Sequence, residues 1–232
     1  MGNDFKNMKN VWDKAYKELE QNEQALSYPT ETIVRLFKGD YLTGDSIDYK
    51  DKKIIDVGFG NGNNSLFFAE IGMQLFGVEI QEEICDILRK KLETRNLSGE
   101  IKVGSNQNLP FDENYFDFLV SWNVIHYEGE EKNIKNAIKE YARVIKKGGR
   151  VIISTTGPGH KILLKSKKVA PHLYEINRPN DPRVGQVHYF FENSEFLEQS
   201  FEPYFENIQA GRINDLLFRE KLDWLLLTGI KK

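Results

Sequence analysis

Cysteine is nearly absent from this chain of 232 residues, and so is any excess of positive charge. The single cysteine, Cys85, cannot form a disulfide within the chain, and it excludes a zinc site built from several cysteines. The formal net charge is −3 at pH 7, whereas proteins that bind nucleic acid or anionic membranes usually carry a basic excess. The charge balance therefore disfavours nucleic acid as a partner.

Long hydrophobic runs are missing as well. No stretch approaches the roughly 20 apolar residues that a membrane-spanning helix needs. The opening segment, MGNDFKNMKNVWDKAYKELE, is charged throughout and lacks the apolar centre of a secretory signal. We therefore expect a soluble cytoplasmic protein with no membrane partner.

The chain does contain enough apolar sequence for a packed core. Hydrophobic residues make up 40% and charged residues 29% of the sequence, a composition typical of an ordered globular protein. The length suits one α/β domain, and we find no internal repeat or low-complexity segment. We therefore expect residues 1–232 to form a single domain.

Strand and helix patterns alternate from Lys53 to Thr156. The expected strands are short apolar runs, and the expected helices carry apolar residues at helical spacing. The strands are expected at KKIIDVG, QLFGVEI, EIKVG, FDFLVSWNV and RVIIST, and the helices at NNSLFFAEIG, QEEICDILRKKLETRN and NIKNAIKEYARVIKKGG, the last closed by Gly148 and Gly149. This alternation predicts a mostly parallel sheet with helices on both faces.

The segments on either side of this core have different patterns. Residues 1–48 are expected to form a helical cap, with one helix over about 5–25 and another that Thr30 can cap. Residues 157–190 are too long for a plain connection and are expected to form a substrate-side insertion with some helix of its own. A capped helix, NSEFLEQSF, and a closing strand pair over about 204–218 and 222–231 would complete seven strands, the last one antiparallel. We expect the cap and the insertion to form the lid and wall of an acceptor pocket. The insertion residues expected to contact a polar acceptor are Lys161, Lys165, Tyr174, His188 and Tyr189.

Three glycines stand at alternate positions in DVGFGNGNNS, behind the first expected strand: Gly58, Gly60 and Gly62. Glycine permits a sharp turn and leaves backbone N–H groups open to a ligand. A dinucleotide site favours the spacing G-x-G-x-x-G, but Asn63 stands where the last glycine would fall. The spacing therefore argues against NAD, and the lack of a following Gly-Lys-Ser/Thr argues against a P-loop.

A carboxylate stands at the tip of the second expected strand. Glu79 lies in GVEI, after the glycine loop in the chain. An acidic side chain at this place is well positioned to accept hydrogen bonds from two ribose hydroxyls. Together, the loop and Glu79 predict a cofactor that contains a ribose.

Over residues about 53–156, the sequence resembles the class I S-adenosylmethionine-dependent methyltransferases. The matching pieces are IIDVGFGNG, GVEI, VGSNQNLPFDENYFDFLVSWNVIHY and VIKKGGRVIIST, which occur in the family's order and at its spacing. The resemblance implies a doubly wound, Rossmann-like α/β sheet, S-adenosylmethionine as the cofactor, and methyl transfer as the activity.

The resemblance also implies which residues at the tips of the first two strands contact the cofactor. These residues are Asp56, Gly58, Phe59, Gly60, Gly62, Glu79 and Ile80. Asp56 and the glycine loop would hold the methionine end, Glu79 would bind the ribose, and Ile80 would lie against the adenine.

Two further segments are implicated by the same resemblance. After the third strand the family usually has an aspartate that contacts the adenine amino group, but here Ser105 stands there, followed by Asn106 and Gln107. That departure removes one charge-assisted contact to the cofactor. Trp122 and Asn123 would stand at the tip of the fourth strand, where the reactive methyl group is expected to pass.

Methyl transfer from a sulfonium is an in-line displacement, so the protein mainly aligns the nucleophile and excludes water. A general base helps if the acceptor is a hydroxyl or a protonated amine, and histidine is the usual choice near neutral pH. His126, which follows the fourth strand, and His188, at the end of the insertion, are the catalytic candidates. A purely structural role is an equally good explanation for each of them.

The acceptor is less well defined by the sequence. Ser121–Val124 do not match the Asn/Asp-Pro-Pro-Tyr pattern of families that methylate nucleic-acid bases or protein glutamine. The tip of the fourth strand has no cluster of acidic residues that would bind a metal ion, because Asp117 lies at the start of that strand.

A small polar molecule is the default acceptor. The segment WDKAYKE…LSYPTETIVRLF weakly resembles methyltransferases of bacterial surface polysaccharides, which favours a sugar or nucleotide-linked sugar, with protein or nucleic acid as the alternative acceptor.

Two alternatives stay open. The insertion's lysines are candidate phosphate contacts, although a solvated basic surface is the commoner reason for such a group. These lysines are Lys161, Lys165, Lys167 and Lys168. A non-catalytic binding protein or partner subunit with this fold is favoured by Ser105 and disfavoured by the intact Asp56 and Glu79. The sequence does not indicate an oligomeric state.

Overall fold

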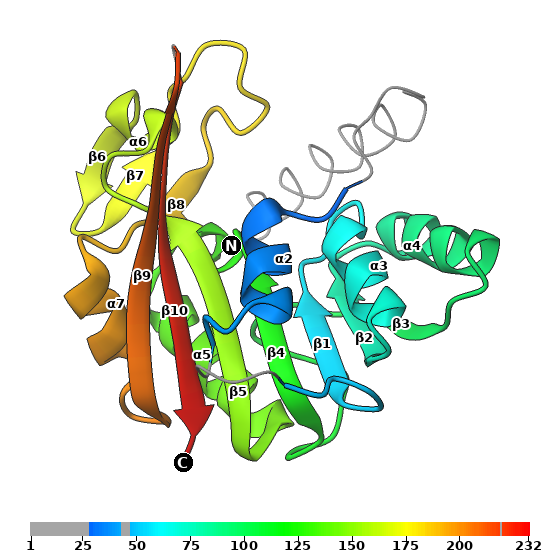
Figure 1. Cartoon of the computed structure of the whole chain (residues 1–232). Helices are drawn as coiled ribbons and strands as arrows, with labels where there is room; N and C mark the ends of the chain where they lie inside the picture. The colour runs from blue at the N-terminus through cyan, green and yellow to red at the C-terminus, as the bar shows by residue number, and fades with distance from the viewer. Residues whose placement is uncertain (1–27, 43–46, 219) are drawn as a thin grey trace.

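A computed structural model of the protein describes residues 28–42, 47–218 and 220–232 (Figure 1). The helix expected over about 5–25 lies outside this part of the chain. Within the described residues, no helix is both long enough and apolar enough to cross a membrane.

A seven-stranded sheet forms the centre of the molecule, in the order β3-β2-β1-β4-β5-β10-β9. Its strands are β1 (Lys53–Val57), β2 (Gln74–Glu79), β3 (Gly99–Val103), β4 (Phe116–Trp122), β5 (Ile145–Thr156), β9 (Phe205–Leu217) and β10 (Glu220–Lys231). The first five strands pair in parallel, and β10 runs antiparallel to both β5 and β9. This arrangement confirms the predicted mostly parallel sheet with an antiparallel last strand.

Helices cover both faces of the sheet, as the alternation predicted (Figure 1). One apolar layer contains residues of α2 (Glu31–Lys38), α3 (Asn63–Glu70) and α4 (Glu82–Thr94), and the other contains residues of α5 (Glu131–Val144) and α7 (Ser194–Phe201). Successive strand residues point to opposite faces, so Ile54 and Phe118 join the first layer while Ile55 and Leu119 join the second.

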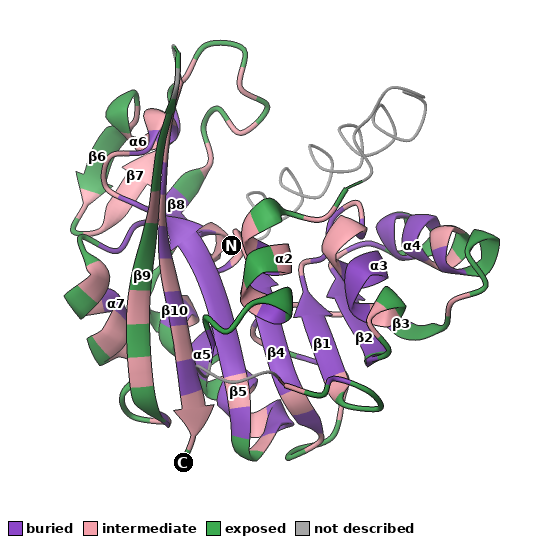
Figure 2. Cartoon of the chain, viewed as in Figure 1, coloured by how far each residue is buried: buried purple, intermediate pink, exposed green. Residues whose placement is uncertain are grey.

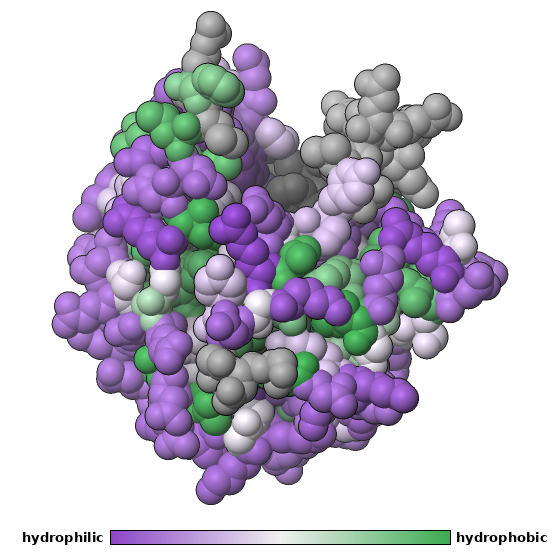
Figure 3. All heavy atoms as spheres, in the orientation of Figure 1, coloured by the Kyte–Doolittle hydropathy of each residue, from purple (hydrophilic) through white to green (hydrophobic). Residues whose placement is uncertain are grey.

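The inner strands carry most of the buried surface of the sheet. Figure 2 shows β1, β2, β4 and β5 as largely buried, whereas the edge strand β9 is mainly exposed or intermediate. Cys85 of α4 is buried, and burial raises the pKa of its thiol to about 12. The face seen in Figure 3 is mostly hydrophilic, with hydrophobic side chains in small groups.

Two helix starts show how the chain is tied together. Thr30 occupies the N-cap of α2, but its side chain makes no capping hydrogen bond, contrary to the expectation. Its backbone N–H instead donates to Asn64 Oδ1 at 2.9 Å, which links the start of α2 to α3. Asn193 caps α7 as predicted, because its Oδ1 accepts from the Phe196 N–H at 2.8 Å.

The boundary between α5 and β5 differs from the prediction. The helix ends at Val144, and Gly148 and Gly149 lie within β5 rather than closing the helix. The pairing of β4 with β5 shifts register between Phe116 and Phe118. Gly148 has a φ of +78°, a conformation that glycine adopts without a steric penalty. The two glycines therefore belong to an irregularity at the start of the strand.

Residues 157–190 form a small antiparallel sheet and contain one short helix. The helix is α6 (Lys161–Leu164), and the strands β6 (Lys167–Ala170), β7 (Leu173–Glu175) and β8 (Val187–Tyr189) pair in the order β6-β7-β8. Ile162, Ile176 and Phe190 form the buried centre of this insertion. It lies beyond the carboxyl end of β5 (Figure 1).

Gly62→Ala is expected to destabilise the protein more than Gly148→Ala. Both glycines have positive φ, +76° and +78°, where an alanine costs about 1–2 kcal/mol. A Cβ on Gly62 would also lie 2.5 Å from Leu88 Cδ1, whereas a Cβ on Gly148 meets nothing within 4 Å. Urea unfolding should show a further loss of about 1–3 kcal/mol for Gly62→Ala, the usual cost of overpacking. Equal losses would show that the close approach to α4 has no energetic effect.

Candidate active site

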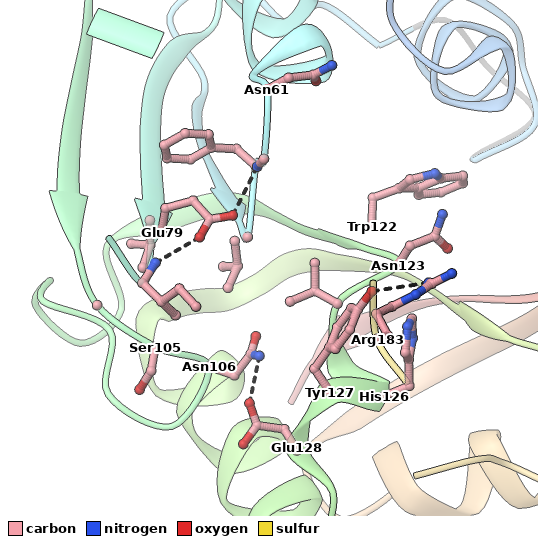
Figure 4. A pocket seen from close by; sticks show the side chains of 18 of the residues that line it. Asn61, Glu79, Ser105, Asn106, Trp122, Asn123, His126, Tyr127, Glu128 and Arg183 are labelled. Atoms are coloured by element: carbon pink, nitrogen blue, oxygen red, sulfur yellow. Dashed lines mark hydrogen bonds between the residues drawn. The ribbon is translucent and has the colours of Figure 1, made fainter. Parts of the chain in front are cut away.

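A cavity of about 470 Å³ lies at the carboxyl ends of β1, β2 and β4 (Figure 4). The strand order reverses between β1 and β4, because β2 and β3 continue on one side and β5 on the other. Ligands of open α/β sheets bind in the crevice at such a switch point. The volume falls within the roughly 300–1,000 Å³ typical of small-molecule sites.

Most residues predicted to contact a cofactor line this cavity. They are Gly58, Phe59, Gly60, Glu79, Ile80, Ser105, Asn106, Trp122 and Asn123. They come from four separate segments of the chain, which the sheet brings to one place. The cavity is therefore the candidate site for the predicted cofactor.

The glycine loop is shaped by backbone conformations that favour glycine. Gly58 and Gly60 have φ of +68° and +57°. A Cβ on Gly58 would lie 2.6 Å from the Val124 side chain, so this part of the loop packs directly against the segment after β4. The loop can therefore end β1 in a sharp turn with bare backbone along the cavity.

Glu79 is the acidic group that joins this loop to β2. Its Oε1 accepts from the Gly60 N–H at 3.1 Å, and its Oε2 accepts from the Ile80 N–H at 2.8 Å (Figure 4). Burial raises the pKa of the carboxyl, and the two N–H donors act in the opposite direction. Each oxygen keeps a lone pair for a further donor, so the group can accept two hydrogen bonds from a ligand.

A second carboxylate, missed by the sequence analysis, stands near Ser105. Glu128 lies in the 3₁₀-helix η1 (Ile125–Glu128) and accepts from Asn106 Nδ2 at 2.7 Å and Gln107 Nε2 at 2.6 Å. The Tyr141 hydroxyl donates to Asn106 Oδ1, which fixes the amide further. Burial raises the pKa of Glu128, whereas both amides lower it. Figure 4 shows Ser105, Asn106 and Glu128 together at one end of the cavity.

Three predicted contact residues do not line the cavity, and each has another role. Gly62 is the N-cap residue of α3 and lies against Leu88. Gln107 holds Glu128. Asp56 is buried and its Oδ2 accepts from the Ser65 hydroxyl at 2.6 Å, so it is turned toward α3. The predicted direct contact of these residues with the cofactor is therefore not supported by where they lie.

The two histidines occupy different positions. His126 lines the cavity, whereas His188 does not; their ring centroids are 5.4 Å apart. Burial lowers the pKa of both imidazoles, with help from the positive charge of Arg183, and brings that of His188 to about 3. Both rings are therefore neutral near pH 7. His126 is the candidate base that faces the cavity, and His188 packs behind it.

Arg183 and Tyr127 are further lining residues that the sequence analysis missed. Arg183 lies between β7 and β8, and its Nη1 donates to the Tyr127 hydroxyl at 3.4 Å. Trp224 reaches the cavity from β10. Tyr127 was within reach of sequence reasoning, because it stands next to the candidate base His126. Nothing near Arg183 in the sequence indicates which way the insertion folds.

The other insertion residues expected at the acceptor do not line the cavity. Tyr174, Tyr189, Lys161 and Lys165 all lie elsewhere. Lys161 forms an ion pair with Glu220 at 2.9 Å. Lys165, Lys167 and Lys168 are exposed, as the solvated-surface explanation predicts.

Comparison with known proteins agrees with this geometry. Residues 55–153 match a family model described as a methyltransferase domain. The chain is 31% identical over 113 residues to a biotin biosynthesis bifunctional protein of Cellvibrio japonicus, covering 49% of this chain and 21% of that protein. It is 34% identical over 106 residues to a tRNA (carboxymethyluridine(34)-5-O)-methyltransferase of Arabidopsis thaliana, covering 44% and 23%. The chain thus spans less than a quarter of either relative.

A solved structure extends the likeness across the whole fold. The 1,6-didemethyltoxoflavin-N1-methyltransferase of Burkholderia thailandensis, with 1,6-didemethyltoxoflavin and S-adenosylhomocysteine bound, superposes with a TM-score of 0.69 at 14% identity. The superposition covers 97% of this chain and 88% of that one and concerns the fold alone. The methyltransferase-domain match and this shared fold support the predicted class I S-adenosylmethionine-dependent methyltransferase, whose cofactor is S-adenosylmethionine.

Asp56→Asn is expected to change how stability depends on pH. Burial raises the pKa of Asp56 from 3.8 to about 7 in the folded protein. Folding thus favours the protonated carboxyl, and this stabilisation is fully present below pH 3.8 and lost as the pH rises through 7. Relative to Asp56→Asn, the wild-type free energy of unfolding should fall by up to about 4 kcal/mol from acidic to mildly alkaline pH. Urea unfolding of both proteins at each pH measures this difference, and a constant difference would contradict the assignment.

Proposed function

We propose that this chain transfers a methyl group from S-adenosylmethionine to a small polar acceptor. The observation that carries the proposal is the placement of Glu79, hydrogen-bonded to the glycine loop, on the wall of a cavity at the switch point of the sheet. Trp122 and Asn123 line the same cavity from the tip of β4.

The cavity offers the groups that this cofactor needs. Glu79 accepts hydrogen bonds from the two ribose hydroxyls, and Ile80 packs against the adenine. Glu128 stands near Ser105, and we propose that it receives the adenine amino group in place of the aspartate that the family usually has. The loop backbone from Gly58 to Asn61 then faces the methionine end.

The other end of the cavity is proposed to hold the acceptor. When bound, S-adenosylmethionine supplies a methyl group on a sulfonium leaving group, so the protein contributes alignment and exclusion of water. Asn123 is held for this purpose, because its N–H donates to the Ser154 carbonyl at 3.1 Å and its Oδ1 accepts from the Ser154 hydroxyl at 2.5 Å. His126, neutral near pH 7, keeps a lone pair that can accept a proton from the acceptor.

Residues 157–190 are proposed to form the wall of the acceptor end. They contribute Arg183 to the cavity, next to Tyr127. Neither relative described above supports the polysaccharide sugar that the N-terminal segment favoured. A tRNA acceptor is the second candidate, suggested by the Arabidopsis relative. The net charge of −3 favours the small molecule.

Calorimetry and a methyl-transfer screen test the function in two stages. S-adenosylhomocysteine should bind and NAD should not. Methyl transfer to small polar acceptors and to tRNA is then measured with radiolabelled S-adenosylmethionine. Binding without transfer to any acceptor would favour the non-catalytic alternative, and the absence of binding would contradict the proposal.

Glu79→Gln is expected to weaken S-adenosylhomocysteine binding about 10- to 100-fold, because hydrogen bonds to a charged acceptor contribute about 1.5–3 kcal/mol. Glu82→Gln is the matched control: Glu82 is exposed, pairs with Arg89 and does not line the cavity. The dissociation constant of Glu82→Gln for S-adenosylhomocysteine should equal that of the wild type. The same constant for Glu79→Gln in a folded protein would remove Glu79 from the binding site.

A further inference from the structure

Arg183 is the one described residue that the insertion contributes to the cavity. We infer that the acceptor carries an anionic group, a carboxylate or a phosphate, and that Arg183 binds this group. The inference rests on the proposed methyl transfer and names the chemical class of its acceptor. It follows from how Arg183 is held, from the donor edge that it presents, and from the charges around it.

The guanidinium of Arg183 is held in place from behind. Its Nε donates to Asp181 Oδ1 and its Nη2 to Asp181 Oδ2, both at 2.8 Å. The Arg183 backbone N–H also donates to Asp181 Oδ1, at 3.0 Å. The Asp181 side chain is 6% exposed and does not line the cavity, whereas Arg183 does. This paired geometry fixes the plane of the guanidinium and leaves its other edge toward the cavity.

The edge of the Arg183 guanidinium that does not pair with Asp181 has donors left for a ligand. Among the interactions of the described residues, Nη1 contacts the Tyr127 hydroxyl at 3.4 Å, which exceeds the 2.7–3.2 Å of an ordinary N–H···O hydrogen bond. A guanidinium carries five N–H donors, and a carboxylate or phosphate oxygen is a stronger acceptor than a phenol. Figure 4 shows Arg183 beside Tyr127, Asn123 and His126, at the end proposed for the acceptor.

The charges along the cavity point the same way. Among the described residues, the carboxylates that line it are Glu79 and Glu128, which lie at the cofactor end (Figure 4). The acceptor end is lined by Arg183 and by neutral groups, including the His126 imidazole. Asp181 offsets part of the arginine charge from behind. An anion at the acceptor end would meet the donor edge directly, because the lining carboxylates Glu79 and Glu128 lie at the cofactor end.

Matched pairs of small ligands test the inference. The pairs are benzoate and benzamide, phenyl phosphate and phenol, and glucose 1-phosphate and glucose. The aromatic pairs suit an end that also presents Trp122, Tyr127 and Trp224. Their dissociation constants are measured by NMR titration on the full chain, with and without S-adenosylhomocysteine. In at least one pair the anion should bind the wild type at least about tenfold more tightly, as expected for a charged hydrogen bond.

Variants then assign the preference to Arg183. Arg183→Gln should abolish it, and Arg183→Lys should keep part of it because the charge remains. Arg178→Gln is the matched control, since Arg178 lies in the same insertion, pairs with Glu220 at 3.0 Å and does not line the cavity. The inference is wrong if no anion binds the wild type more tightly than its neutral partner, or if the preference survives in Arg183→Gln.

The cofactor's own carboxylate could bind to the same edge, and a further arm separates the two sources. Arg183→Gln should bind S-adenosylhomocysteine as the wild type does. A weaker affinity for S-adenosylhomocysteine, with unchanged affinity for 5′-methylthioadenosine, which lacks the amino-acid carboxylate, would assign Arg183 to the cofactor and overturn the inference. A wild-type protein that binds no S-adenosylhomocysteine contradicts the proposed function instead, and the titrations without it still measure the anion preference.

Discussion

The hydrogen bond from the Gly60 N–H to Glu79 connects the two strand ends on which the cavity is built. It exists because β1 and β2 are parallel and in register, with Val57 opposite Val78, so both strands end at the same level. The carboxylate is buried there, and burial of a charge is unfavourable unless donors surround it. The Gly60 and Ile80 N–H groups meet that requirement, and in doing so they fix the path of the glycine loop.

The cavity is chemically divided along its length. One end presents two carboxylates held by backbone and amide donors, and the other presents an arginine held by a carboxylate outside the cavity. In both cases the charged group that faces the ligand is fixed by partners that do not depend on the ligand. Such preorganisation reduces the cost of ordering the site on binding.

The main architecture was predictable because it follows from local patterns. Apolar runs of strand length alternate with helical spacings, and a glycine loop followed by Glu79 locates the strand tips. The orientation of Asp56 was also within reach. It shares a sheet face with Ile54, the face that α3 covers, so a two-residue period already turns it toward Ser65. The family resemblance alone led to a different prediction for this residue.

Other features depend on contacts between distant parts of the chain. Glu128 lies at the same end of the cavity as Ser105 although it belongs to another segment, so position in the sequence could not reveal it. Arg183 meets Tyr127 across 56 residues through the fold of the insertion, which has no strong local pattern. The end of α5 at Val144 was mispredicted because glycine is common both at helix ends and in strand irregularities.

The cavity wall is assembled from segments that are far apart in the sequence. They run from Val57 in β1 to Trp224 in β10, which are the first and the last strands of the sheet in chain order. An unfolded chain has no such wall, so a ligand that fills the cavity binds the native state alone. Ligand binding therefore adds to the free energy of unfolding. A ligand at a free concentration of a hundred times its dissociation constant stabilises the native state by about 2.7 kcal/mol. Cellular metabolites that occupy the site would thereby protect the chain from unfolding and from the proteases that act on unfolded chains.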